Sequence, residues 1–383
     1  MVMTMIYLDN AATSMPKPAA VLRAIGECAE YYGANPGRSG HRLSMLAAKK
    51  VFECRERAAK LFDAEPENVV FTANCTHALN LAIKGAVPQG GHVVISDLEH
   101  NSVFRPVYKL SQSQGVSYSL AEVFEGDSEK TLRAFENQLT AKTKLVACTA
   151  GSNLCGIMLP CDGLYELCKK NNIPLLVDLA QAAGVRKTSL TKADYLCMPG
   201  HKGLYGPTGT GMLITKRGEE LSTVMEGGTG SQSYLKEQPQ DMPDHLESGT
   251  LNTYGIAGLN EGLRFVSSYG FDRIYQHEMS LAKTLYDELS HIKGIRLYTH
   301  RPQEGVHLPV ICFNLGEVRS ETVVEKLSER GFALRGGFHC APLAHKKLNT
   351  GEYGAVRASF SVYNTQEQVM RLAYELRRLQ RTA

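Results

Sequence analysis

The sequence predicts an α/β fold with a mostly parallel, doubly wound sheet and a smaller α+β C-terminal domain. Between residues 68 and 215, short apolar runs rich in β-branched side chains alternate with segments of helical periodicity, which is typical of βα units. After Gly255, two long helical stretches lead into shorter strands and helices. Because 383 residues are more than one hydrophobic core usually organises, the length indicates two to three domains.

Residue ranges follow from the periodicity of the apolar side chains. The expected strands are 68–72, 92–96, 144–150, 174–178, 194–198 and 211–215. The expected helices are 41–62, 76–84, 101–114, 129–138, 161–170, 256–268 and 271–292. We therefore predict a large domain over residues 14–255 and a small domain made of residues 1–13 and 256–383.

Composition and charge argue against several classes of protein. The chain is 43% hydrophobic and 21% charged, as folded globular proteins are. Its net charge is +3 with no block of like charges, so neither nucleic acid nor a membrane is an expected partner. The first eight residues do not resemble a signal peptide, so a cytoplasmic location is expected. Ten cysteines without a Cys-x-x-Cys pair or zinc-like spacing predict mostly reduced core residues and no metal site.

Polar side chains follow several predicted strands, where doubly wound sheets usually bind their ligands. Asp178 closes one strand, with Gln181 one turn later; its carboxylate could cap a helix or hold the protonated ring nitrogen of a cofactor. Thr76 stands at a helix start, which suits a phosphate, although a simple N-cap would look the same. His100 could be structural, or could stack on a planar ring and move protons.

The most distinctive local sequence is the loop 198–211, in which five glycines and two prolines surround Lys202. Its spacing matches neither a Walker P-loop nor Gly-x-Gly-x-x-Gly. The pKa of a lysine amine is about 10.4 in water, and burial or a nearby cation lowers it, which makes Schiff-base chemistry accessible. A lysine taken alone would be interpreted as a surface residue, but this loop favours a reactive amine.

A second candidate reactive group, Cys340, follows His339 on a Gly-rich loop near the C-terminus, which is the setting of a reactive thiol. Arg357 is a natural bidentate partner for a substrate carboxylate. Arg357 and Arg335 could equally form surface ion pairs.

Together these stretches resemble the cysteine desulfurases and selenocysteine lyases of the class V aminotransferase fold, especially the group whose cysteine loop reads Arg-x-Gly-x-His-Cys. The resemblance extends from residues 7–13 (YLDNAAT) to residues 363–365 (YNT). The other matching stretches are 35–41, 71–80, 99–100, 152–153, 178–181, 200–211, 248–252 and 335–342. It implies a pyridoxal 5′-phosphate (PLP)-dependent, aminotransferase-like fold (fold type I) whose large domain binds PLP.

The resemblance also implies roles for single residues. Lys202 would bind PLP covalently, and His100 would stack on its ring. Asp178 and Gln181 would hold the ring nitrogen and the phenolic oxygen. Thr76 and His201 would contact the phosphate. Thr250 would reach the cofactor of a neighbouring subunit, so a homodimer is implied.

The implied substrate is an amino acid of the cysteine type. Asn153, Arg357 and Arg335 would bind its carboxylate. Lys202 would remove its α-proton, and Cys340 would receive the sulfur as a persulfide while alanine is released. A protein that accepts sulfur or selenium would be a further partner. Cysteine and selenocysteine share the same ammonium, carboxylate and chain length, so the residues do not decide between them.

Three features depart from the family pattern. Pro199 stands where a serine is usual, so one phosphate contact is missing or replaced. Asn74-Cys75 stands where Gly-Thr is usual, and Gly37 occupies a position often held by histidine. Two other hypotheses stay open: an aminotransferase or β-eliminating PLP enzyme in which Cys340 is incidental, and a non-catalytic scaffold.

Overall fold

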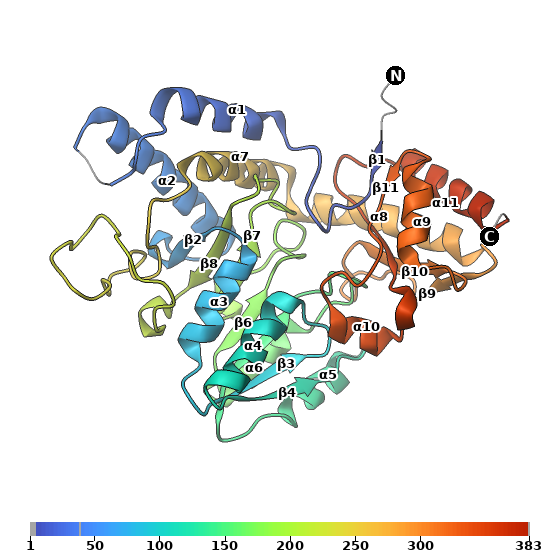
Figure 1. Ribbon diagram of the computed structural model, residues 1–383, viewed down its shortest axis with the longest axis horizontal. Coiled ribbons are helices and arrows are strands. Elements are labelled where there is room, and N and C mark those ends of the chain that lie inside the picture. The colour runs from blue at the N-terminus through green and yellow to red at the C-terminus, as the bar shows by residue number, and fades with distance from the viewer. Residues whose placement is uncertain (1–4, 38–39, 382–383) are drawn as a thin grey trace.

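The computed structural model describes residues 5–37 and 40–381 and is built around a seven-stranded sheet (Figure 1). In spatial order its strands are β2 (Val69–Thr72), β8 (Gly211–Thr215), β7 (Tyr195–Pro199), β6 (Leu175–Asp178), β5 (Thr143–Thr149), β3 (His92–Ser96) and β4 (Ser117–Ala121). Strand β8 is antiparallel to both its neighbours, and the other neighbouring strands are parallel. The expected mostly parallel α/β sheet is therefore confirmed.

Helices cover both faces of this sheet. They are α1 (Ala19–Glu27), α2 (Arg42–Leu61), α3 (Cys75–Ala86), α4 (Asn101–Ser113), α5 (Ser128–Glu136), α6 (Cys161–Lys170) and α7 (Thr253–Tyr269). Alternate strand residues face opposite cores: Val94 packs in the core that includes α2, α6 and α7, whereas Val93 and Ile95 pack in the core that includes α3 and α4. This two-sided burial explains why the strands read as nearly continuous apolar runs.

The C-terminal part forms two smaller sheets with a core of its own. The antiparallel one contains β12 (Val356–Ser359), β10 (Val310–Leu315) and β9 (Ile295–Leu297), and the parallel one pairs β1 (Ile6–Tyr7) with β11 (Phe332–Ala333). The helices of this part are α8 (Phe271–Ser290), α9 (Ser320–Ser328), α10 (Pro342–Leu348) and α11 (Gln366–Gln380). The chain start therefore joins the C-terminal sheets, while α7 packs against α1 and α2; the division at residue 255 stays a prediction.

Most predicted elements are present with small shifts at their ends. Around the large sheet, strand β4 and helix α1 have no counterpart among the predicted ranges, and the elements after residue 292 were predicted only as a group of shorter strands and helices. β4 is a partly exposed edge strand, so it lacks the apolar run of its neighbours. Within the described residues, no helix combines the length and apolarity needed to cross a membrane.

Candidate active site

A cavity of about 110 Å³ lies where β5, β6 and β7 end and α3 and α4 begin. Its wall is formed by Asn74, Cys75, Thr76, Leu79, His100, Ser102, Thr149, Asn153, Asp178, Ala180, Gln181, Pro199, His201 and Lys202. Seven residues proposed from the sequence meet here although up to 126 positions separate them: Thr76, His100, Asn153, Asp178, Gln181, His201 and Lys202. The cavity therefore lies at the edge of the sheet where the sequence predicted that a ligand would bind.

Lys202 is half-buried on the loop between β7 and β8. Burial, followed by the positive charge of Arg357, lowers the pKa of its amine. The glycines of this loop are needed for close packing: a Cβ on Gly203 would lie 2.3 Å from the Ala183 carbonyl oxygen. The Ser14 hydroxyl donates to the Lys202 carbonyl at 2.8 Å, which ties the loop to the N-terminal segment.

Asp178 is buried at the end of β6 with 2% of its surface exposed. Its Oδ1 accepts hydrogen bonds from the Ala180 backbone N–H at 2.8 Å and from the Cys75 thiol at 3.4 Å. Burial raises the pKa of Asp178, while the Ala180 N–H, the charge of Lys202 and the Cys75 thiol oppose that rise. Turns rather than a helix follow Asp178, so the helix-cap interpretation is wrong.

His100 caps α4: its Nδ1 accepts from the Ser102 backbone N–H at 3.0 Å. Burial, followed by the charge of Lys202, lowers the pKa of His100 to about 4. The ring is therefore neutral near pH 7, and because Nδ1 is an acceptor, Nε2 carries the proton. A neutral, half-buried imidazole is suited to stacking against a flat ligand.

The start of α3 offers backbone N–H groups to an anion. Asn74 is the N-cap, since its side chain accepts from the His77 N–H at 2.9 Å; the interpretation of Thr76 as the cap is therefore wrong. Thr76 instead contacts the Ser102 hydroxyl at 2.8 Å. His201 lies nearby, and its buried Nδ1 finds no hydrogen-bond partner among the described residues. Burial lowers the pKa of His201 to about 4.

Arg357 is fully buried on β12, so its interpretation as a surface ion-pair residue is wrong. It donates to Asp9 Oδ1 at 2.6 Å and to the Asn153 carbonyl at 2.9 Å. Its Nε and the Asn153 Oδ1 are buried and without a partner in the described part of the chain. Arg335 is half-buried beside it through a backbone bridge between the two residues. Sequence reasoning missed Asp9, although the YLDNAAT stretch that contains it was part of the resemblance.

Cys340 is exposed, on a tight turn in which both His339 (φ 50°) and Cys340 (φ 54°) have left-handed backbone conformations. The Asn101 backbone N–H donates to the Cys340 carbonyl at 2.8 Å, which ties this turn to the start of α4. His339 is buried, and its Nε2 lies 2.9 Å from the Ala355 carbonyl, so Nε2 must be the protonated nitrogen. His339 therefore anchors the turn. Thr250 is exposed near Asn35 and does not line the cavity of its own chain.

The buried His339 predicts a loss of stability in acid. Burial lowers its pKa to about 3, against an ordinary value of 6.5, so below pH 6.5 the unfolded chain binds a proton that the folded chain does not. The free energy of unfolding should then fall as pH drops from 6.5 towards 3, by up to about 1.4 kcal/mol per pH unit. Urea unfolding should show a shallower pH slope for His339→Gln and an unchanged slope for the control His41→Asn, at an exposed position where asparagine can also cap α2. Equal slopes for the His339 variant and the unmodified protein would contradict this.

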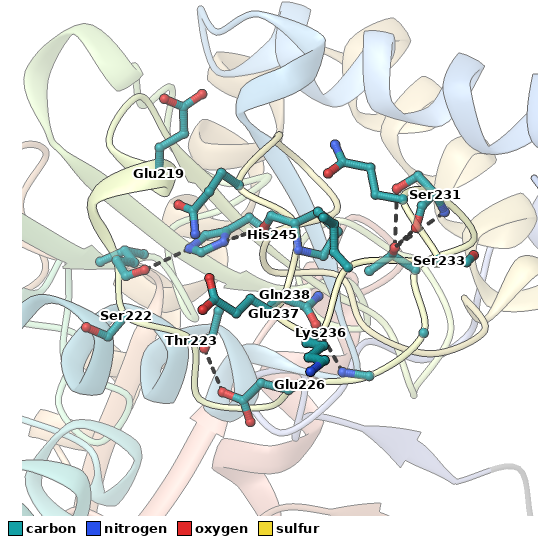
Figure 2. A pocket seen from close by; sticks show the side chains of 18 of the residues that line it. Glu219, Ser222, Thr223, Glu226, Ser231, Ser233, Lys236, Glu237, Gln238 and His245 are labelled. Atoms are coloured by element: carbon teal, nitrogen blue, oxygen red, sulfur yellow. Dashed lines mark hydrogen bonds between the residues drawn. The ribbon is translucent and has the colours of Figure 1, made fainter.

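A larger hollow of about 940 Å³ lies elsewhere, inside the segment 219–245 (Figure 2). The His245 ring holds this segment together, with its two nitrogens 2.8 Å from the Pro239 and Leu221 carbonyls. All residues that line it come from this one segment, and none is a candidate site residue. The smaller cavity is thus the better candidate active site.

The model of the aminotransferase class-V family matches residues 6–372. The chain belongs to this family. Two relatives of this class-V protein are named probable cysteine desulfurase. The one from Methanothermobacter thermautotrophicus is 33% identical over 97% of this chain and 94% of its own length. The one from Pyrococcus abyssi is 34% identical over 95% of this chain and 91% of its own length.

A solved structure, the apo cysteine desulfurase of Thermococcus onnurineus NA1, is similar to this class-V protein over 99% of the chain and 95% of its own length. The TM-score is 0.91 and the sequence identity 32%. The family resemblance and the α/β fold predicted from the sequence are confirmed.

Proposed function

We propose that this protein is a PLP-dependent cysteine desulfurase that converts L-cysteine to L-alanine and leaves the sulfur on Cys340. One observation carries the proposal: a single cavity joins the Lys202 amine, the buried Asp178 carboxylate and the neutral His100 ring, and the turn bearing an exposed cysteine is bonded to the first residue of α4. The names of the relatives at 33% and 34% identity support the same activity.

The residues present fit PLP. The Cys75 thiol and the Ala180 N–H both donate to Oδ1 of Asp178. Among the described residues, this leaves Oδ2 for the ring nitrogen of PLP. Gln181 donates to the Ala11 carbonyl at 3.1 Å and keeps a second N–H for the phenolic oxygen. The unpartnered His201 Nδ1 and the start of α3 suit the phosphate. When bound, PLP supplies an electron sink for charge developing at the substrate Cα.

The chain's own residues would then act as follows. Arg357 is held by Asp9 and the Asn153 carbonyl, so its guanidinium is a rigid anchor for the substrate carboxylate. Lys202, whose pKa is lowered, would accept the α-proton on its Nζ. The Cys340 thiolate would attack the substrate sulfur. As the carbon–sulfur bond breaks, sulfur stays on Cys340 as a persulfide and the carbon skeleton leaves as alanine.

Measuring alanine release tests this function. Purified protein incubated with PLP should release alanine from L-cysteine and form a persulfide at Cys340, detected by mass spectrometry. Alanine from L-selenocysteine alone would make the protein a selenocysteine lyase instead. Transfer of the amino group to a 2-oxo acid, with no alanine from either substrate, would make it an aminotransferase.

We further propose that the protein is a cytoplasmic homodimer. Thr250 is exposed and does not line the cavity of its own chain, which supports a role at a partner's cofactor. All ten cysteines, which lie in the described part of the chain, are free, as is usual in a reducing compartment. Sedimentation at micromolar concentration should give twice the 42.0 kDa of one chain.

The unusual Cys75 should support Asp178. Because the Cys75 thiol lowers the pKa of Asp178, Cys75→Ala should favour the protonated carboxyl and weaken PLP binding by about fivefold, as expected for one modest hydrogen bond. Absorbance titration with PLP measures the affinity. Cys75→Ser, which keeps a donor, should bind PLP nearly normally, and Cys54→Ala, a buried cysteine on α2, serves as the control. Equal affinities for the Ala and Ser variants of Cys75 would contradict this role.

A further inference from the structure

A second hollow adjoins the candidate active site, between the outer parts of α3 and α4. It has a volume of about 360 Å³ and shares Thr76, His100 and Ser102 with the cavity that contains Lys202. Cys340 is part of its wall. We call it the outer groove; it connects the candidate nucleophile to the protein surface.

The charged side chains of the outer groove are Lys84 on α3 and Arg105 and Lys109 on α4. No aspartate or glutamate lines it, and within the described part of the chain these three cations form no ion pair. Arg105 and Lys109 are four residues apart, so they share one face of α4 and repel each other slightly. An anionic ligand would relieve this uncompensated charge.

The spacing of these charges indicates an extended ligand. Lys84 is on α3, whereas Arg105 and Lys109 are on α4, about 6 Å apart along its axis. Cations carried by two helices suit a ligand with several negative charges. A chain segment with several carboxylates could reach all three.

If the proposed function holds, the persulfide on Cys340 must pass its outer sulfur to an acceptor thiol, and this thiol has to reach Cys340 through the outer groove. An acceptor thiolate attacks the outer sulfur of the persulfide, and the bond between that sulfur and Cys340 Sγ breaks. A new sulfur–sulfur bond forms on the acceptor, Cys340 leaves as thiolate, and it takes up the proton that the acceptor thiol lost. The exchange needs no further oxidant or reductant.

We propose that the outer groove docks an acidic segment of a sulfur-acceptor protein, whose carboxylates pair with Lys84, Arg105 and Lys109 while its cysteine reaches Cys340. The sulfur transfer in this proposal rests on the proposed function, whereas the docking of an acidic segment does not. Charge complementarity selects the partner and brings it to the groove faster at low salt.

Three synthetic peptides test the transfer. Each has one central cysteine, flanked by aspartate and glutamate, by serine and glycine, or by lysine. The PLP-loaded protein is charged with L-cysteine, and persulfide transfer to each peptide is followed by mass spectrometry. At low ionic strength the acidic peptide should react at least about tenfold faster than the neutral one, and the advantage should vanish near 1 M salt, where the screening length falls to about 3 Å. Equal rates for the three peptides would overturn the proposal.

A triple charge reversal, Lys84→Glu with Arg105→Glu and Lys109→Glu, should abolish the preference for the acidic peptide. Its alanine release with dithiothreitol as acceptor should be retained, because none of the three lines the cavity that holds Lys202. The charge of Arg105 also helps to lower the pKa of His100, after burial and the charges of Lys202 and Arg335, so Lys84→Glu with Lys109→Glu serves as a second variant that leaves this charge in place. The matched control is Lys60→Glu with Lys216→Glu and Lys236→Glu, all exposed, which changes the net charge equally and should keep the preference. A preference kept by the groove variant, or lost in the control, overturns the proposal.

A binding measurement separates this proposal from the proposed function. A fluorescent acidic peptide with serine in place of cysteine cannot react, so its anisotropy with the full chain reports docking alone. Binding that is tighter than that of the neutral peptide, and lost in the groove variant, supports docking even if no persulfide ever forms. Equal binding of the acidic and neutral peptides, or tighter binding of a single-stranded oligonucleotide of the same charge, overturns it.

Discussion

Replacing Lys202 by alanine should remove both cofactor attachment and turnover. The amine of Lys202 is the one group in the cavity wall able to form a Schiff base with an aldehyde among the described residues, and its lowered pKa also makes it the best placed acceptor for the α-proton. Loss of a nucleophile and a general base together should reduce kcat by at least about 10⁴-fold. The overall fold should persist, because the half-buried Lys202 side chain belongs to none of the hydrophobic cores.

Borohydride trapping provides the direct measurement. After reduction with PLP bound, the peptide containing residue 202 should gain the mass of the reduced cofactor, and in Lys202→Ala no lysine should carry it. Lys187→Ala, which replaces an exposed lysine, is the matched control and should be labelled at residue 202 as usual. Labelling of another lysine in the unmodified protein would overturn the assignment of the cofactor site.

Replacing Cys340 by serine should abolish alanine and sulfide formation from cysteine while sparing PLP binding. Cys340 lines the outer groove but not the cavity that contains Lys202, so the cofactor should not sense the change. Serine keeps the size and the left-handed backbone of the turn but is a far weaker nucleophile. We expect turnover of cysteine to fall by at least about 10³-fold, and turnover of selenocysteine to fall less because the carbon–selenium bond is weaker.

Alanine release and PLP titration, side by side, check this second prediction. Cys161→Ser, a half-buried cysteine at the start of α6, should behave as the unmodified protein. Unchanged turnover of cysteine by Cys340→Ser would favour an aminotransferase or a β-eliminating enzyme in which Cys340 is incidental. Loss of PLP binding in this variant would instead mean that the turn supports the cofactor cavity.

The Arg357–Asp9 pair illustrates why part of the site could not be predicted. Its partners are 348 residues apart, on β12 and next to β1, and only the pairing of the chain start with the C-terminal sheets brings them together. Read from the sequence, either residue could be a surface charge. The contact makes Arg357 a buried, paired cation, a state that no neighbouring residue in the sequence indicates.

The sequence by itself determined the features that depend on local pattern. Alternating apolar runs and helical periodicity predicted the parallel sheet, and the Gly-rich loops predicted where Lys202 and Cys340 would be presented. The prediction of the sheet is confirmed because strand burial and helix periodicity are governed by neighbouring residues, and the roles of Lys202 and Cys340 stay predictions.

Only the tertiary structure decided which distant groups touch. The edge strand β4, the Cys75–Asp178 hydrogen bond and the cations of the outer groove all depend on how separate elements pack. Packing also sets burial, and burial is the main cause of the lowered pKa values of His100, His201 and Lys202. Burial is a property of the assembled fold, so no local pattern carries it.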